Sequence, residues 1–121
     1  MANDILDLQK FNGLTIRDVG GLSQGSSEVF FRLIDKDGEI CGFSFSNEEE
    51  YGNDVSVYLE DFYGNPNLSG AIFYEVIEKS GHGNSLTYTF YTIKTSFGYL
   101  DLRFAGRSNG YHSENCNVYV F

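Results

Sequence analysis

The segment from Gly106 to Glu114 holds the densest set of residues that could do chemistry in this sequence. An arginine guanidinium presents a planar fork of donors that fits a carboxylate or a phosphate. Tyrosine and arginine are also the residues that most often anchor protein interfaces. The segment therefore predicts a recognition loop, whose candidate binding residues are Arg107, Asn109, Tyr111, His112 and Glu114. A hairpin turn at Asn109, with Tyr111 packed back onto a sheet, is an equally open interpretation.

The same segment raises the question of catalysis, because Ser108 and Ser113 lie close to His112 and Glu114. A nucleophilic serine needs a general base and a third group that orients it. Neither serine lies in the strained G-x-S-x-G turn that exposes such a nucleophile. We therefore predict no catalytic residue and no enzyme, with an enzyme centred on His112 as an alternative hypothesis.

The spacing of the potential metal ligands does not match that of known metal sites. His82 and His112 are the only two histidines, and they do not have the spacing of zinc ligands. The stretch Asp35-Lys36-Asp37-Gly38 is similar to the start of a calcium loop, but the twelfth position is Ser46 instead of glutamate. It predicts a hairpin turn with glycine at positive φ. We expect no metal and no cofactor.

Acidic residues are concentrated in the middle of the chain. The sequence has 17 acidic and 8 basic residues, a formal charge of −9. The stretch from Asp35 to Glu78 contains eleven acidic residues and one basic residue, Lys36, so its formal charge is −10. Such a field repels phosphate backbones, so we expect no direct binding of nucleic acid. It would steer a protein partner with a basic surface, and its candidate binding residues are Glu48, Glu49, Glu50 and Asp54. Solubility alone is the other interpretation.

Length and composition predict a single β-rich domain over residues 1–121. Aromatic residues make up 17% of the chain, all of them Phe or Tyr, and these favour pleated sheets. Cys41 and Cys116 lie in apolar strand-like contexts and are predicted to be buried free thiols, with one disulfide left open. No apolar run is long enough to span a membrane, and the N-terminus lacks the pattern of a signal peptide. We expect a cytoplasmic protein that does not bind membranes.

Alternating apolar residues predict the elements that carry these groups. Short helical turns are expected in 4–12, and strands in 14–19, 27–34, 39–46, 55–60, 70–79, 86–95, 99–104 and 116–120. Both faces of 70–79 are apolar, which is typical of a central or doubly covered strand. Residues 80–85 are predicted to form a glycine-rich hairpin loop with His82 at its tip. In 99–104, Asp101 and Arg103 point away from the apolar face, within reach of cross-strand partners.

This pattern predicts a mainly β fold, with α+β left open. Strand spacing and short connections favour an antiparallel meander of about seven or eight strands, forming a curved sheet or a partly open barrel. At most one or two short helical turns are expected.

The motif residues in 88–99, 102–104 and 108–114 resemble a family of small phage and prophage proteins that share a C-terminal SNGY[YH]SE-type motif and have no assigned activity. Residues 19–31 and 54–61 fit the same pattern, so the resemblance covers most of the chain after Leu14. Members of that family carry a paired-cysteine segment where this chain reads Glu49-Glu50-Tyr51-Gly52-Asn53-Asp54. The resemblance therefore implies a phage origin but transfers no metal or redox role.

Together these features predict a non-enzymatic, phage-associated interaction protein in the host cytoplasm. The expected partner is a host protein with a basic surface, and the expected role is inhibition of a host defence, in the manner of an anti-CRISPR protein, or of a nucleic-acid enzyme. One alternative is a small-ligand protein that binds a nucleotide through Arg107, Asn109 and Tyr111. A virion or assembly component is another, and a homodimer stays open.

Overall fold

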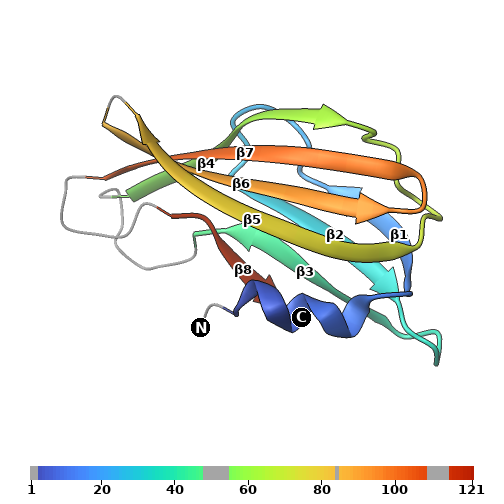
Figure 1. Cartoon of the computed structure of the whole chain (residues 1–121). Coiled ribbons are helices and arrows are strands. Elements are labelled where there is room, and N and C mark those ends of the chain that lie inside the picture. Colours follow the sequence, from blue (N-terminus) through green and yellow to red (C-terminus); the bar gives the residue numbers. More distant parts are fainter. Residues whose placement is uncertain (1–2, 48–54, 84, 109–114) are drawn as a thin grey trace.

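The structure, a computed structural model, describes residues 3–47, 55–83, 85–108 and 115–121 (Figure 1). Within these ranges the chain forms one 3₁₀ helix and eight strands, whose bounds are η1 Ile5–Phe11, β1 Thr15–Gly20, β2 Glu28–Ile34, β3 Ile40–Ser46, β4 Val55–Gly64, β5 Phe73–Gly83, β6 Leu86–Thr95, β7 Gly98–Ser108 and β8 Asn117–Val120. The expected mainly β, antiparallel fold is confirmed.

The strands form two antiparallel sheets that pack face to face. The first sheet has the order β1-β2-β3-β8, and the second has the order β4-β7-β6-β5. Each contains a meander of three consecutive strands, β1-β2-β3 and β5-β6-β7. Each meander is extended by a strand from elsewhere in the sequence, because β8 pairs with β3 and β4 pairs with β7. The described strands therefore form a two-sheet sandwich of curved sheets (Figure 1).

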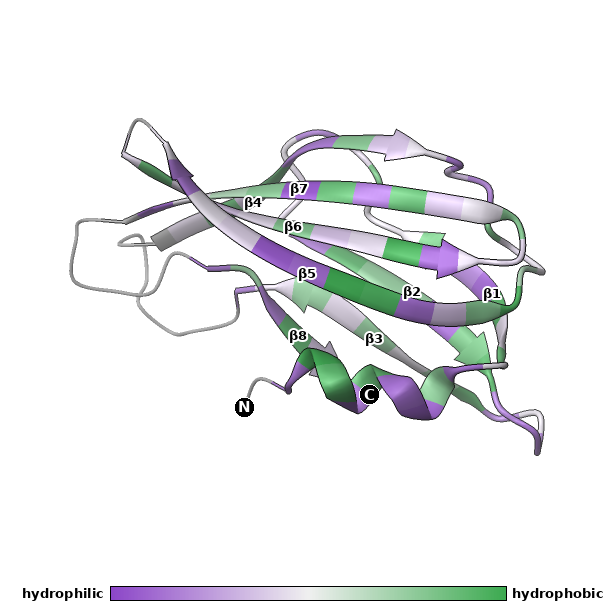
Figure 2. Cartoon of the chain, in the orientation of Figure 1, coloured by the Kyte–Doolittle hydropathy of each residue, from purple (hydrophilic) through white to green (hydrophobic). Residues whose placement is uncertain are grey.

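Aromatic rings join the two sheets in a common core. The predicted inward faces are confirmed for Val29, Phe31 and Leu33 of β2, which are all fully buried. Across the sandwich, the ring of Phe45 on β3 stacks on that of Tyr91 on β6 with centroids 4.1 Å apart. Figure 2 shows the alternation of hydrophilic and hydrophobic residues along β7 that such one-sided burial requires.

Helix η1 lies near β5 and β8, on the side of the sandwich where those strands run (Figure 1). Asp4 caps it, because its carboxylate accepts a hydrogen bond from the backbone N–H of Leu6 at 2.9 Å. Leu8 and Phe11 are buried and complete the core. In the part of the chain that the structure describes, no helix has the length and apolar character to cross a membrane.

The prediction of a central strand at 70–79 is wrong, because β5 is an edge strand of the second sheet. A bulge between Phe73 and Glu75 shifts the register by one residue. After it, Val76 lies opposite the buried Ile93 and faces inward, whereas Ile77 lies opposite Thr92 and faces outward. Tyr74 and Ile77 are consequently exposed, although the sequence places them in an apolar run. The bulge interrupts the two-residue period on which the prediction depended.

The hairpin predicted at 80–85 is confirmed, but its loop is shorter than predicted, because β5 continues to Gly83, which pairs with Leu86 of β6. His82 therefore lies on a strand instead of a loop tip. It is opposite Thr87, whose hydroxyl oxygen is 3.5 Å from the Nδ1 atom of His82. Glycines at 81 and 83 did not end the strand, because pairing with β6 holds the backbone extended.

Candidate binding face

Arg107 is the one predicted binding residue among the described ranges. It lies near the end of β7, is exposed, and is the cross-strand partner of Ser56 on β4. The other predicted residues lie outside the described residues; they are Asn109, Tyr111, His112, Glu114, Glu48, Glu49, Glu50 and Asp54. Their predicted roles stay predictions.

The described acids of the 35–78 stretch do not form one continuous surface. Asp35 shapes the β2–β3 turn, since its carboxylate accepts hydrogen bonds from the backbone N–H groups of Asp37 and Glu39. On the second sheet, Glu60 is ion-paired with Arg103 at 2.9 Å. The acids are thus divided between a hairpin tip and the other sheet, where part of their charge is neutralised by bases.

A different surface gathers recognition groups, namely the outer face of the second sheet, hereafter the aromatic face. Strand alternation sends inward residues such as Leu100 and Leu102 to the core and their neighbours outward. The outward side chains that define the aromatic face are Tyr63 of β4, Ile77 of β5, Phe90 and Thr92 of β6, and Tyr99, Asp101 and Arg103 of β7. Tyr63 is 57% exposed, Tyr99 54% and Phe90 38%.

A hydrogen-bonded pair forms the floor of this face. Thr92 and Asp101 are cross-strand partners, and the Thr92 hydroxyl donates to the Asp101 carboxylate at 2.6 Å. Two adjoining hollows meet at this pair. One has a volume of about 260 Å³ and is bordered by Tyr63 and Phe90, and the other has about 530 Å³ and is bordered by Tyr99. The face thus presents aromatic rings around a small polar centre.

Arg103 supplies a donor at the border of the first hollow. Its Nη2 atom lies 2.9 Å from a Glu60 carboxylate oxygen and 3.7 Å from one of Asp61. Its Nε atom is buried and has no hydrogen-bond partner among the described residues. A buried donor without a partner costs free energy.

Tyr63 and Asp61 are held together at the rim of the face. The Tyr63 hydroxyl donates to the Asp61 carboxylate at 2.6 Å. This hydrogen bond is the main cause that lowers the pKa of Asp61 below its usual value, aided by the Phe62 backbone N–H and the Arg103 charge. The same hydrogen bond raises the pKa of Tyr63. The tyrosine ring is therefore oriented by an ionised carboxylate.

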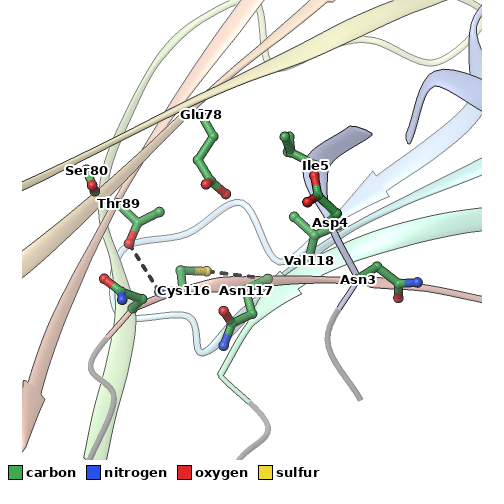
Figure 3. A pocket seen from close by; sticks show the side chains of 10 residues that line it. Asn3, Asp4, Ile5, Glu78, Ser80, Thr89, Cys116, Asn117 and Val118 are labelled. Carbon is green, nitrogen blue, oxygen red and sulfur yellow. Dashed lines mark hydrogen bonds between the residues drawn. The ribbon is translucent and has the colours of Figure 1, made fainter. Parts of the chain in front are cut away.

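A second, more polar cavity of about 290 Å³ lies between β5, β6 and the residues around Cys116 (Figure 3). Figure 3 shows Glu78 pointing into it from β5. At its floor the backbone N–H of Cys116 donates to the Thr89 hydroxyl at 3.1 Å, and the Tyr91 hydroxyl donates to the Cys116 carbonyl at 3.0 Å. The cavity is lined mainly by polar groups, with Asp4 at its other side.

Cys116, which lines this cavity, and Tyr91, which bonds to it, are structural groups. Cys41 and Cys116 are both free thiols, as predicted, although Cys41 is only partly buried. Burial raises the pKa of the Cys116 thiol, and burial is also the main cause that raises the pKa of Tyr91. A thiol that stays protonated is a poor nucleophile. Among the described residues, no group of three His, Cys, Asp or Glu side chains could hold a metal ion.

Sequence reasoning identified only part of the aromatic face. The alternation in 99–104 placed Asp101 and Arg103 outward and within reach of cross-strand partners, which the contacts of Asp101 with Thr92 and of Arg103 with Glu60 confirm. The aromatic residues around them were missed, because they come from three strands whose register the sequence does not show. One available signal was that Tyr63 and Phe90 lie on the polar faces of their strands, as Asp101 and Arg103 lie on the polar face of theirs.

No protein-family model, no curated protein and no solved structure matches this chain. The resemblance to phage proteins therefore stays a prediction that depends on its motif residues alone.

Proposed function

We propose that this chain is a non-enzymatic interaction protein that binds a host protein through the aromatic face. The supporting observation is the gathering of exposed Tyr63, Phe90 and Tyr99 side chains around the Thr92–Asp101 pair. Apolar surface exposed in one patch on a folded protein commonly marks an interaction site.

The chemistry of the aromatic face suits a protein partner. Tyrosine rings offer large, rigid contact areas that lose little side-chain entropy on binding, and Tyr and Arg are enriched among residues that carry binding energy. The polar centre would fix the orientation of the partner, because Asp101 and Arg103 can pair with groups opposite to them. Hydrophobic contact would thus supply affinity and the charges would supply specificity.

Charge favours a basic partner. The net charge of −9 gives the chain a negative field that speeds encounter with a positive surface. Enzymes that handle nucleic acid carry such surfaces, because they contact phosphate backbones. A host defence nuclease or another nucleic-acid enzyme is therefore the proposed target, with inhibition by occupation of its basic surface. This narrower proposal also depends on the phage resemblance and on a location in the host cytoplasm.

The test begins with a tagged chain used to purify its partner from host lysate. The dissociation constant is then measured for Tyr99→Ala and Phe90→Ala, with Phe121→Ala as the matched control. Phe121 is 55% exposed and lies beside Gly42 of the first sheet, away from the aromatic face. We expect each aromatic-face variant to weaken binding about tenfold or more, or about 1.4 kcal/mol, and the control to leave it unchanged.

A second part of that experiment measures how affinity changes with salt concentration and with the charge of the chain. Affinity for a basic partner should fall as salt rises, because screening shortens the range of the field. Reversal of Glu48, Glu49 and Glu50 to lysine separates the predicted acidic site from the aromatic face. If the triple reversal abolishes binding while Tyr99→Ala has no effect, the partner binds the acidic segment and the proposal for the aromatic face is wrong.

A small ligand is the second candidate, favoured by Arg103, Tyr63 and Phe90, which line one hollow together. Aromatic rings can stack on a nucleotide base while an arginine binds its phosphate. A nucleotide that binds the folded chain should raise the melting temperature with concentration. A shift that Arg103→Gln removes would favour this candidate, and no shift with any nucleotide would reject it.

A further inference from the structure

The larger hollow of the aromatic face, hereafter the Tyr99 hollow, combines mainly apolar walls with one acidic group. It has a volume of about 530 Å³ and lies over β5, β6 and β7, beside the β6–β7 turn. Tyr74 and Tyr99 line it and are 45% and 54% exposed. Among the lining residues that the structure describes, Asp101 is the one acid. A side chain with an apolar stem and a positive end group therefore matches this hollow.

The Asp101 carboxylate is held in place but has no base paired with it. The Thr92 hydroxyl donates to its Oδ1 atom at 2.6 Å, which orients the side chain. In the part of the chain that the structure describes, no other donor bonds to this carboxylate, and the ion pairs there involve other acids. Asp101 is half-buried. Its Oδ2 atom is therefore open to a charged donor from outside, and hydrogen bonds between charged groups are the stronger ones.

Two bases near Asp101 on this face are already directed to other acids. Lys94 also lines the Tyr99 hollow, but its ammonium lies 3.5 Å from a Glu75 carboxylate oxygen. Arg103 follows Asp101 by two residues on β7, and its guanidinium lies 2.9 Å from Glu60. These two positive charges are largely offset by their partners, so the charge of Asp101 stays available.

We propose that the Tyr99 hollow binds an arginine side chain of the partner protein, with its guanidinium on the Asp101 carboxylate and its methylene stem against Tyr74 and Tyr99. The inference rests on the proposed function, because the arginine belongs to the partner that covers the aromatic face. Charge complementarity supports this occupant, since a basic surface carries arginines and the chain has a net charge of −9. An arginine anchored in a hollow is also a common source of binding energy at interfaces.

Arginine suits this site better than lysine. Its guanidinium is planar, so it stacks on a tyrosine ring while its edge donates to a carboxylate. Its several donors allow one hydrogen bond to Oδ2 of Asp101 and a second to the oxygen of Thr92, which donates to Oδ1 and still has free lone pairs. A lysine ammonium is more strongly hydrated, so it loses more when it enters an apolar hollow.

The adjoining hollow, bordered by Tyr63 and Phe90, is less suited to a cation. Lys79 and Arg103 both line it, so two positive groups stand beside the single carboxylate of Asp101. Like charges close together are unfavourable. The arginine of the partner is therefore assigned to the Tyr99 hollow.

The test uses the purified chain and three blocked amino acids, namely the N-acetyl methylamides of arginine, lysine and citrulline. Citrulline has nearly the shape of arginine but no charge. An NMR titration at low salt should show saturable shifts of the Tyr99 and Thr92 resonances with the arginine probe, with a dissociation constant of about 1–10 mM. The lysine probe should bind about threefold more weakly or less well still. The citrulline probe should give no saturable shift.

Variants of the chain assign the contacts. Asp101→Asn keeps an acceptor for Thr92 but removes the charge, so the dissociation constant of the arginine probe should rise about tenfold or more. Asp37→Asn removes the same charge on the exposed β2–β3 turn and should leave that constant unchanged. Tyr99→Phe keeps the ring and should bind the arginine probe as the parent chain does, whereas Tyr99→Ala should bind it several-fold more weakly.

Measurements with the purified partner separate this inference from the proposed function. Asp101→Asn should weaken partner binding about tenfold or more, as Tyr99→Ala does. If Tyr99→Ala and Phe90→Ala weaken partner binding and Asp101→Asn does not, the arginine assignment is overturned and the proposed function stands. An arginine probe that binds no better than the lysine probe, or equally well to Asp101→Asn, would also overturn the assignment. The proposed function fails by a different result, namely a partner that binds both aromatic-face variants as tightly as the parent chain.

Discussion

Replacing Phe45 with alanine should remove the central contact between the two sheets. Phe45 on β3 is fully buried. Its ring stacks on Tyr91 at 4.1 Å and lies 6.4 Å from the ring of Phe104, both of which belong to the second sheet. Loss of a buried phenylalanine removes its transfer free energy and its aromatic contacts, and it leaves a cavity. We expect the free energy of unfolding to fall by about 3–5 kcal/mol.

That loss is large enough to measure without ambiguity. In a domain of this size, about 3–5 kcal/mol corresponds to a melting temperature roughly 10–20 °C lower. Urea unfolding should show a lower midpoint with an unchanged slope, because the surface exposed on unfolding is nearly the same. Phe45→Leu keeps most of the apolar volume and should cost less than Phe45→Ala.

Phe121→Ala is the matched control, since the same side chain is removed from a position that is 55% exposed. It should change stability by no more than about 1 kcal/mol. If Phe45→Ala cost as little as Phe121→Ala, the two sheets would not pack on this ring, and the sandwich described above would be wrong.

Tyr63→Phe removes the hydroxyl that donates to Asp61, so the pKa of Asp61 should rise toward its ordinary value in an NMR titration; an unchanged pKa would mean that another group lowers it. The pKa of Asp61 is lower in the folded state than in the unfolded state, so its ionisation stabilises the fold above about pH 3.8. This stabilisation is lost as the pH falls through the folded-state pKa, and the loss of stability in acid should be smaller in Asp61→Asn. Cys41 is partly exposed and should react with a thiol reagent at pH 8 much faster than Cys116, of which only 3% is exposed. Equal rates would contradict the burial of Cys116. Gly42→Ala should destabilise the first sheet, because a Cβ there would lie 2.0 Å from a backbone carbonyl oxygen of β2, and a variant as stable as the parent in urea would show that the strand is placed differently.

The strands were predictable because burial on one face leaves a period of two in the sequence. The alternation of Val29, Phe31 and Leu33 identified β2 and its inward face directly. The division into two sheets was not predictable in the same way. β3 pairs with β8, and β4 with β7, so both pairings join segments that are far apart in the chain. Local pattern carries no information on such partners.

β5 shows why an apolar run is a weak guide to position in a sheet. Its residues Tyr74 and Ile77 are apolar or aromatic yet exposed, since a bulge moves them out of the inward register. The candidate site posed a related difficulty. Asp101 and Arg103 could be placed on one face from sequence, but Tyr63 and Phe90 join them only through the pairing of three strands.

Hydroxyl-radical footprinting of the chain, free and bound to its purified partner, is the most direct test of binding through the aromatic face. We expect protection of Tyr63, Phe90 and Tyr99 in the complex, with Phe121 and Leu6, both exposed elsewhere, modified at the same rate in both states. Protection of Phe121 or Leu6, with the three aromatic-face residues unchanged, would contradict it.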